Sequence, residues 1–352
     1  MAKGSSAQTG RQLARVSRAP VRTPARMRAV AITGVNTFLG RELIGLLEED
    51  EGVGKIVLLD VRAPRSISPK SRYYDVDLTA PGVDSRIAEI LDAEHVDDLA
   101  HLAFVARPTQ ATAWAHELES VGTMHLLDAC RRRPPRRFVL CSTALVYGPH
   151  PANPNFLTEA HAVRGLPGSS FVADKVDAEA QVLRYAAEQS ASCVTVLRFA
   201  PILGPSVDNH VTRWLSRRWV PTVLGHDPLL QFLHELDASA AVKHALDRGV
   251  AGVFNVAGHG VLPVSIALKL TGRLAAPIPY RLLRGVTTLW WVAQFGDAPA
   301  AMVAALRYLC VVDTARARDV LRFEASHSGR DALLDFEGAL RLRDAGLLKE
   351  VA

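Results

Sequence analysis

Two glycines and a threonine follow an early apolar run at a spacing that suits dinucleotide binding. Gly34, Thr37 and Gly40 come directly after residues 29–33 and lead into a helical pattern. A glycine after a strand permits a tight turn, and one at the start of a helix allows close packing against the strand. The free N–H groups at the helix N-terminus bind a pyrophosphate. The pattern favours a dinucleotide-binding turn with threonine at its middle position; the alternative is an ordinary flexible turn.

A carboxylate at the end of the next apolar run points to the same ligand. Asp60 closes residues 55–60 and follows Gly40 by 20 residues. A carboxylate there accepts hydrogen bonds from the adenosine ribose hydroxyls and repels the 2′-phosphate of NADP. Arg62 weakens this discrimination against NADP if it stacks on adenine or pairs with a phosphate. We expect NAD as the cofactor; the alternative is that Asp60 is an ordinary acid at a strand end.

Alternating strand and helix patterns must position these residues. The apolar runs that predict strands are residues 29–33, 55–60, 73–76, 98–103, 137–142, 193–199 and 253–257. Helical patterns occupy residues 38–49, 84–91, 109–131, 171–189 and 237–248, with Asp237 expected as an N-cap. Continuous apolar strands with helices between them predict a parallel sheet covered on both faces. We therefore expect a doubly wound α/β (Rossmann) fold with a smaller C-terminal lobe.

The order of the motifs resembles the extended short-chain dehydrogenase/reductases, or NAD-dependent epimerase/dehydratases. The resemblance covers about residues 28–340, and its sequence stretches are residues 33–40, 60, 75–78, 101–103, 142–148, 197–205, 231–237 and 254–258. We expect three parts: a disordered basic tail (1–27), an NAD-binding Rossmann core (28–200) and a mixed segment with late core elements and the substrate lobe (201–352). The resemblance implies these NAD-contacting residues: Gly34, Thr37, Phe38, Leu39, Gly40, Asp60, Arg62, Asp77, Leu78, Leu102, Ala103, Phe104 and Lys175.

The catalytic positions implied by the resemblance are Thr143, Phe171 and Lys175. The family places a Ser or Thr, a Tyr and a Lys there; the lysine lowers the pKa of the tyrosine and holds the nicotinamide ribose, and the tyrosine transfers a proton. Phe171 has no hydroxyl, whereas Thr143 can still polarise a carbonyl. Pro201 stands where many relatives carry a substrate-binding Asn. Ala144 and the residue after it replace the Asp-Glu of the dehydratase branch, which makes 4,6-dehydration by that route unexpected.

The missing tyrosine leaves three interpretations open. The protein is an enzyme with a surrogate acid, for which the candidates are Ser169, Ser170, Asp174 and Tyr147. Or it binds NAD without turnover, as a regulatory or scaffolding protein. Or the catalytic helix is aligned differently, although Phe171, Lys175 and Glu179 keep the spacing of the motif. The leading hypothesis is an NAD-dependent epimerase or oxidoreductase that acts on a sugar nucleotide or related secondary alcohol by hydride transfer.

The substrate lobe offers two kinds of candidate. Its basic residues suit a nucleotide diphosphate, or else form a solvated helix face; they are Arg213, Arg217, Arg218, His226 and His234. The apolar run 286–295, with Trp290 and Trp291, suits a pocket for an apolar substrate such as a sterol or acyl chain. More often such a run is the core of a small lobe. The resemblance also implies a homodimer that pairs helices 109–131 and 171–189.

Composition sets the remaining expectations. Residues 1–28 carry seven basic and no acidic residues, so the rest has a net charge of −2 although the whole chain has +5. Such a tail cannot offset the entropy of ordering, and we expect it to be disordered; a nucleic-acid or anionic-surface arm, a transit peptide or a start at Met27 are the alternatives. Four scattered cysteines and a longest apolar stretch of 12 residues (285–296), against the ~20 of a membrane span, predict a reduced, cytoplasmic protein. We expect no metal, membrane span or nucleic acid, and a small-molecule substrate.

Overall fold

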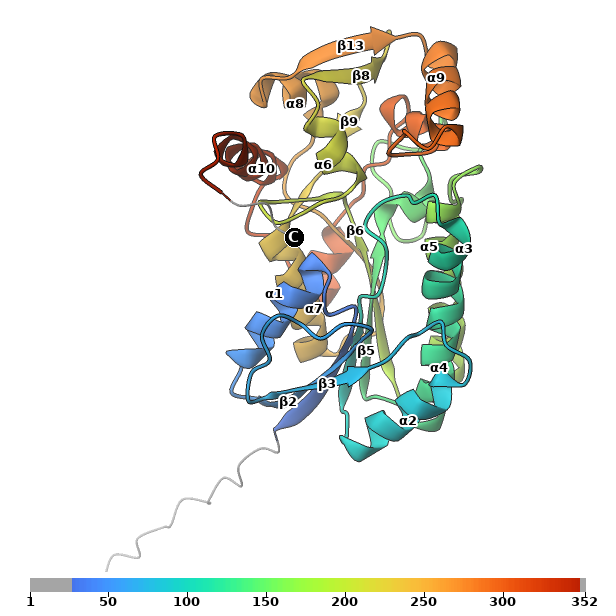
Figure 1. Ribbon diagram of the computed structural model, residues 1–352, viewed down its shortest axis with the longest axis vertical. Coiled ribbons are helices and arrows are strands. Elements are labelled where there is room, and N and C mark those ends of the chain that lie inside the picture. The colour runs from blue at the N-terminus through green and yellow to red at the C-terminus, as the bar shows by residue number, and fades with distance from the viewer. Residues whose placement is uncertain (1–26, 349–352) are drawn as a thin grey trace, which may run out of the picture.

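Seven parallel strands form the central sheet of this protein, in the order β11-β6-β5-β4-β1-β2-β3 (Figure 1). The computed structural model describes residues 27–348, so the predicted tail, apart from Met27, lies outside the described residues. The strands are β1 Arg28–Thr33, β2 Val53–Asp60, β3 Ser71–Asp75, β4 Asp98–His101, β5 Arg137–Thr143, β6 Cys193–Phe199 and β11 Gly252–Val256. The predicted doubly wound α/β fold is confirmed.

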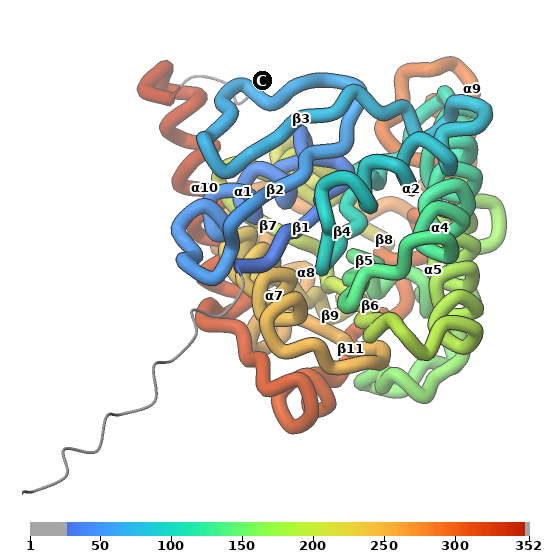
Figure 2. The backbone as a smooth tube through the Cα atoms, turned by 90° about the horizontal axis from the view of Figure 1, so that it is seen from below, coloured from blue at the N-terminus to red at the C-terminus, as the bar shows by residue number. Residues whose placement is uncertain are grey.

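Helices cover both faces of the sheet because successive side chains of its strands point to opposite faces (Figure 2). Val30 and Ile32 pack with Leu43 in one core cluster, whereas Ala31 between them packs with Leu126 in the other. One face carries α1 Phe38–Glu48 and α7 Glu235–Arg248, and the other carries α2 Val83–Ala93, α4 Gly122–Arg132 and α5 Ser170–Glu188. The two buried layers hold the strand ends in fixed positions.

The strand order reverses at β1, which lies between β4 and β2. In doubly wound sheets, ligands bind in the crevice at the carboxyl ends of the strands beside such a reversal. A buried hydrogen-bond chain ties the strands together here: Thr33 Oγ1 lies 2.7 Å from His101 Nδ1, and His101 Nε2 lies 2.9 Å from Thr123 Oγ1. Burial lowers the pKa of His101 to about 3, so its imidazole is neutral at physiological pH.

Two helices differ from the predicted ones. The helix expected at 109–131 is interrupted: α3 (Thr112–His116) leads into a π-helical turn, Glu117–Val121, before α4 begins. Helix α7 begins at Glu235, two residues earlier than expected, and its N-cap is His234, which accepts a hydrogen bond from Leu236 N. The prediction that Asp237 is the N-cap was wrong, because its buried carboxylate accepts hydrogen bonds from the backbone N–H groups of Ser326 and His327.

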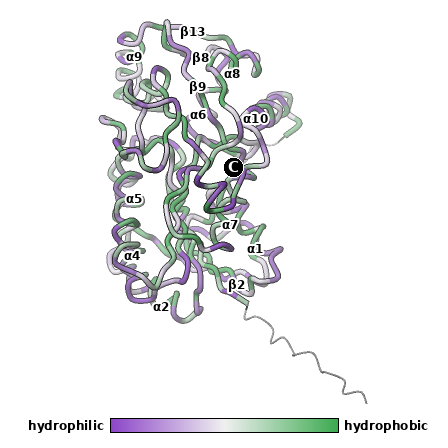
Figure 3. Tube along the Cα trace, turned by 180° about the vertical axis from the view of Figure 1, so that it is seen from behind, coloured by the Kyte–Doolittle hydropathy of each residue, from purple (hydrophilic) through white to green (hydrophobic). Residues whose placement is uncertain are grey.

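A smaller lobe lies at the end of the molecule opposite α2 (Figure 1, Figure 3). Its centre is the parallel pair of β8 and β13, flanked by α8 and α9. The bounds are β7 Ile202–Leu203, α6 His210–Leu215, β8 Trp219–Val223, β9 Leu229–Leu230, β10 Leu233–His234, β12 Leu262–Pro263, α8 Val264–Leu270, β13 Leu274–Ile278, α9 Tyr280–Val292 and α10 Gly329–Asp344. Within residues 27–348, no helix combines the length and apolar character needed to cross a membrane.

Candidate active site

The glycine turn after β1 has no room for side chains. Gly34 has φ +71°, and a Cβ there would lie 2.5 Å from the carbonyl oxygen of Leu102. A Cβ on Gly40 would lie 2.4 Å from the carbonyl oxygen of Gly34. Thr37 caps α1: its hydroxyl donates to the Gly34 carbonyl at 2.8 Å and accepts from Gly40 N at 3.0 Å. The threonine therefore replaces the middle glycine without blocking the glycine turn, and the residues present fit a dinucleotide.

Asp60 stands beside this turn. Its Oδ2 accepts a hydrogen bond from Asn36 N at 3.3 Å, and its Oδ1 accepts one from Arg62 N at 3.4 Å. These long bonds hold the half-buried carboxylate next to the turn and leave lone pairs for further donors, as a ribose-binding acid requires. Arg62 is exposed at the same edge.

The other residues predicted to contact the cofactor differ in how deeply they are buried. Leu102 and Ala103 are buried behind Gly34, and Phe104 stacks at a tilt on His101, with ring centroids 4.8 Å apart. At the start of α1, Phe38 is half-buried and Leu39 is buried. Leu78 is also buried. Asp77 is exposed and accepts hydrogen bonds from the backbone N–H and hydroxyl of Thr79. The backbone of Leu102 and Ala103 therefore forms the floor of the glycine turn.

Phe171 and Lys175 lie one turn apart on α5 and touch. The Nζ of Lys175 is 4.1 Å from the centroid of the Phe171 ring. The same Nζ donates to the carbonyl oxygen of Val105 at 3.1 Å and to Oε1 of Glu119 at 2.6 Å. An ammonium has three donors, so two protein partners leave one N–H for another ligand.

Glu119 is a site residue that sequence reasoning missed. It lies in the π-helical turn, is fully buried, and accepts a hydrogen bond from Val105 N at 2.7 Å. Burial raises the pKa of Glu119, and the Lys175 ammonium opposes this rise. Among the described residues, its Oε2 has no hydrogen-bond partner. The sequence did carry a signal for Glu119: this acid lies seven residues before the apolar Leu126, and that spacing places both residues on one face of a helix.

Thr143 ends β5 and caps a short 3-10 helix, Ala144–Tyr147, by accepting a hydrogen bond from Leu145 N at 3.3 Å. It is half-buried at the carboxyl end of the sheet. Leu145 packs against Phe171 in a small apolar cluster, which brings the 143–145 segment and α5 together. The structure thus places Thr143, Phe171 and Lys175 at one end of the sheet.

The surrogate acids differ in their surroundings. The hydroxyl of Tyr147 is buried, accepts a hydrogen bond from Arg198 at 2.7 Å and donates one to Asn255 at 2.8 Å, so it belongs to a structural network. Ser170 is exposed. Buried oxygens without a partner remain on two of the candidates, Ser169 and Asp174. Asp174 also pairs with His116 at 2.8 Å.

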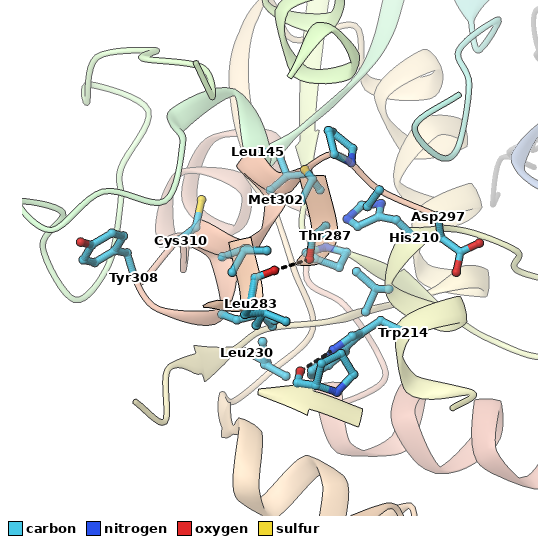
Figure 4. A pocket seen from close by; sticks show the side chains of 18 of the residues that line it. Leu145, His210, Trp214, Leu230, Leu283, Thr287, Asp297, Met302, Tyr308 and Cys310 are labelled. Atoms are coloured by element: carbon cyan, nitrogen blue, oxygen red, sulfur yellow. Dashed lines mark hydrogen bonds between the residues drawn. The ribbon is translucent and has the colours of Figure 1, made fainter. Parts of the chain in front are cut away.

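A cavity of about 350 Å³ opens between these elements and the lobe (Figure 4). Ala144, Leu145 and Pro201 form its wall on the sheet side, and Trp290 of α9 lines it from the lobe. His210, the first residue of α6, also lines it and contacts Phe171 edge-on, with ring centroids 5.7 Å apart. Of the apolar run 286–295, Val286, Thr287 and Trp290 line the cavity, and most of the run is exposed, so it is not the core of the lobe.

The basic residues expected for a diphosphate do not converge. Arg217 lines the cavity, but its guanidinium pairs with Asp297 at 2.6 Å. Arg213 pairs with Asp208 at 2.7 Å. The remaining three lie apart: Arg218 and His226 are exposed, and His234 is buried as the cap of α7.

Comparison with known proteins agrees with this geometry. The sequence model of the NAD dependent epimerase/dehydratase family matches residues 30–257. An uncharacterised protein of Mycobacterium tuberculosis (strain ATCC 25618 / H37Rv) is 30% identical over 316 residues, which cover 88% of this chain and 83% of that protein. This chain belongs to the NAD-dependent epimerase/dehydratase family. NAD, the predicted cofactor, is the one that defines the family.

Solved structures share the fold. The UDP-glucose 4-epimerase of Thermotoga maritima with UDP-glucose superposes with a TM-score of 0.68 at 17% identity, covering 90% of this chain and 99% of that one. MoeE5 with UDP-glucuronic acid and NAD gives a TM-score of 0.69 at 24% identity, over the same shares. WbmG of Bordetella bronchiseptica with NAD gives 0.68 at 17% identity, covering 94% and 99%.

Proposed function

We propose that this protein is an NAD-dependent epimerase or oxidoreductase of the extended short-chain type. It transfers a hydride at the carbinol carbon of a secondary alcohol, either a sugar nucleotide, as in the neighbours crystallised with UDP-sugars, or a related alcohol. One observation carries the proposal: Thr143 and Lys175 lie at the sheet end where the glycine turn opens, and the residues that follow Thr143, Ala144 and Leu145, line a cavity large enough for a small molecule. NAD held in this crevice supplies the hydride acceptor.

The side chains have separate roles in this proposal. The glycine turn and Asp60 hold the adenosine half of NAD. The third N–H of Lys175 orients the ribose on the nicotinamide side, because Glu119 and Val105 fix its other two. The Thr143 hydroxyl, which accepts from Leu145 N, is free to donate its own proton to the substrate oxygen.

Phe171 favours a second candidate, an NAD-binding regulatory or scaffolding protein without turnover. A phenyl ring neither donates a proton to the substrate oxygen nor accepts one, and this ring packs on the Lys175 ammonium instead. The two candidates share the cofactor site and differ only in whether hydride moves.

NADH absorbance, together with chromatographic separation of sugar epimers, tests the proposal on a panel of UDP-sugars and secondary alcohols, because epimerisation returns the hydride and leaves no net NADH. We expect turnover with at least one alcohol, and Thr143→Ala should lower it at least tenfold while NAD affinity stays unchanged. Ser85→Ala is the matched control, because Ser85 is an exposed hydroxyl on α2 at the opposite end of the molecule. Tight NAD binding without turnover on any of the compounds would instead support the regulatory protein.

We also propose a homodimer formed through α3, α4 and α5. Their outer surface exposes three large apolar side chains, Trp114, Met124 and Leu183. Light scattering should give twice the mass of the chain, and Leu183→Arg should yield a monomer. A monomeric native protein would contradict the dimer.

The four cysteines are free, which supports action in the reducing cytoplasm.

A further inference from the structure

The cavity beside Phe171 is walled mainly by hydrocarbon. Leu283, Val286 and Trp290 of α9 line it, as do Met302 and Leu306 of the 3-10 helix that follows, Ala300–Leu306. Figure 4 shows Leu283 and Met302 in this wall. The cavity's volume of about 350 Å³ lies near the lower end of the ~300–1,000 Å³ of small-molecule pockets. Such walls favour a ligand that is itself mostly apolar, since a polar ligand would lose its hydration without replacement.

Most polar groups in this wall already have protein partners. Trp214 Nε1 donates to the carbonyl of Pro221 at 3.0 Å, and the Thr287 hydroxyl donates to the carbonyl of Leu283 at 2.8 Å. Gln231 is satisfied at both ends by the backbone of Val312. These side chains offer a ligand little beyond their apolar surface.

The charged groups of the wall are paired as well. Arg217 is bound to Asp297, and Asp297 also lies 3.7 Å from Arg213, which itself pairs with Asp208. A nucleotide diphosphate would have to displace these carboxylates and would meet the charge of Asp297 in the cavity. The arrangement therefore disfavours a doubly charged anion.

His210 is different. Its Nδ1 is buried and has no hydrogen-bond partner, and it is the only such atom among the described cavity-lining side chains. The backbone of Ala106 acts on the imidazole by a hydrogen bond that raises its pKa slightly. Burial, with a smaller contribution from the Lys175 ammonium, lowers the pKa of His210 to about 4. A neutral imidazole carries its proton on one nitrogen and a lone pair on the other, and in the tautomer protonated at Nε2 the unpaired Nδ1 is an acceptor for a hydroxyl.

We propose that this cavity binds an uncharged, largely hydrocarbon secondary alcohol whose hydroxyl donates to Nδ1 of His210. The inference rests on the proposed function and narrows its substrate class from sugar nucleotides to apolar alcohols. His210 contacts the ring of Phe171, and the cavity reaches Ala144, the residue after Thr143. The imidazole thus offers the substrate oxygen a hydrogen-bond partner, which the phenyl ring of Phe171 does not.

Calorimetry on the NAD-saturated protein tests this with four probes: 2-octanol, its methyl ether, UDP-glucose and UDP. The ether keeps the oxygen and the chain but cannot donate a hydrogen bond. We expect 2-octanol to bind about tenfold more tightly than the ether, the typical worth of one hydrogen bond to an otherwise unpaired group. His210→Phe should remove that difference and leave the ether's affinity nearly unchanged. His95→Asn is the control, because His95 is exposed and lies outside the cavity lining.

A second variant keeps the test informative if His210→Phe fails to fold. Trp290 is 57% exposed and lines the cavity, so Trp290→Ala should fold. It should weaken the alcohol and the ether equally, by about tenfold or more, through lost apolar contact. Tighter binding of UDP-glucose than of 2-octanol would overturn the proposal, as would an alcohol preference that survives His210→Phe.

Turnover separates the two proposals. Apolar alcohols that bind but never reduce NAD would leave this inference standing and remove the proposed oxidoreductase. Reduction of NAD by a UDP-sugar, without binding of the apolar alcohol, would do the reverse.

Discussion

Lys175 and Glu119 form an ion pair inside the protein, with Nζ 2.6 Å from Oε1 and side-chain exposures of 10% and 0%. The two residues are 56 positions apart in the chain. The π-helical turn carries the carboxylate and α5 carries the ammonium. Because each charge alone would be costly to bury, the position of the lysine depends on the carboxylate.

Removing one partner of this pair should be costly. We expect Lys175→Met to lower the free energy of unfolding by about 3–5 kcal/mol, because Glu119 keeps an uncompensated charge. The double variant Lys175→Met/Glu119→Gln should recover most of the loss in urea unfolding. Lys243→Met is the control, since its pairs with Asp247 and Asp50 are more exposed and should each be worth about 1 kcal/mol or less. A double variant as unstable as the single one would contradict the coupling.

Asp60 should select NAD over NADP. Asp60→Ala should weaken NAD binding by about 1.5–3 kcal/mol, the worth of a hydrogen bond to a charged group, and should reduce the preference over NADP because the 2′-phosphate no longer meets a carboxylate. Calorimetric titration of both cofactors measures this. Asp92→Ala is the control, because Asp92 is an exposed acid on α2. Equal affinities for NAD and NADP in the native protein would refute the assignment.

Phe171→Tyr should restore a proton donor at the catalytic position. Phe171 is buried, so an unpaired hydroxyl costs at most about 1–3 kcal/mol of stability. We expect NAD-linked turnover to rise, with general acid–base catalysis worth ~10²–10⁴-fold. Phe336→Tyr, at a buried position on α10, controls for the cost of a buried hydroxyl. A folded Phe171→Tyr protein with unchanged turnover would show that the position is no longer catalytic.

The stability of the protein should fall in mild acid because His101 is buried in its neutral form. The pKa of His101 is about 3 in the folded state, against a usual value of 6.5. Between these values the unfolded state binds a proton that the folded state does not, so the stabilisation is present above pH ~6.5 and is lost as pH falls toward ~3. Each pH unit in this window costs up to about 1.4 kcal/mol.

In urea unfolding series, His101→Gln should lower the proton uptake on unfolding, which sets this pH slope, by about one proton. Part of the slope should remain, because His210 also has a lowered pKa in the folded protein. His95→Asn, at an exposed position, should leave the slope as it is. An unchanged slope in His101→Gln would mean that other groups cause the acid sensitivity.

The sequence by itself determined the sheet and the cofactor turn. The bounds of β6 match the predicted 193–199, and the glycine spacing at 34–40 proved to be a cradle that side chains would fill. These features depend on local order: the alternation of apolar runs along a strand and the spacing of a few residues around one turn. Such patterns keep their meaning without knowledge of the rest of the chain.

Only the tertiary structure decided which groups face one another in the site. Glu119 reaches Lys175, and His210 reaches Phe171, across 56 and 39 positions of the sequence. The cavity collects residues from Ala144 to Cys310, and Asp297 neutralises Arg217, which as an arginine in the substrate lobe suited a diphosphate. Charge pairing and unpaired atoms depend on distances set by packing between distant segments, and no local pattern in the chain records those distances.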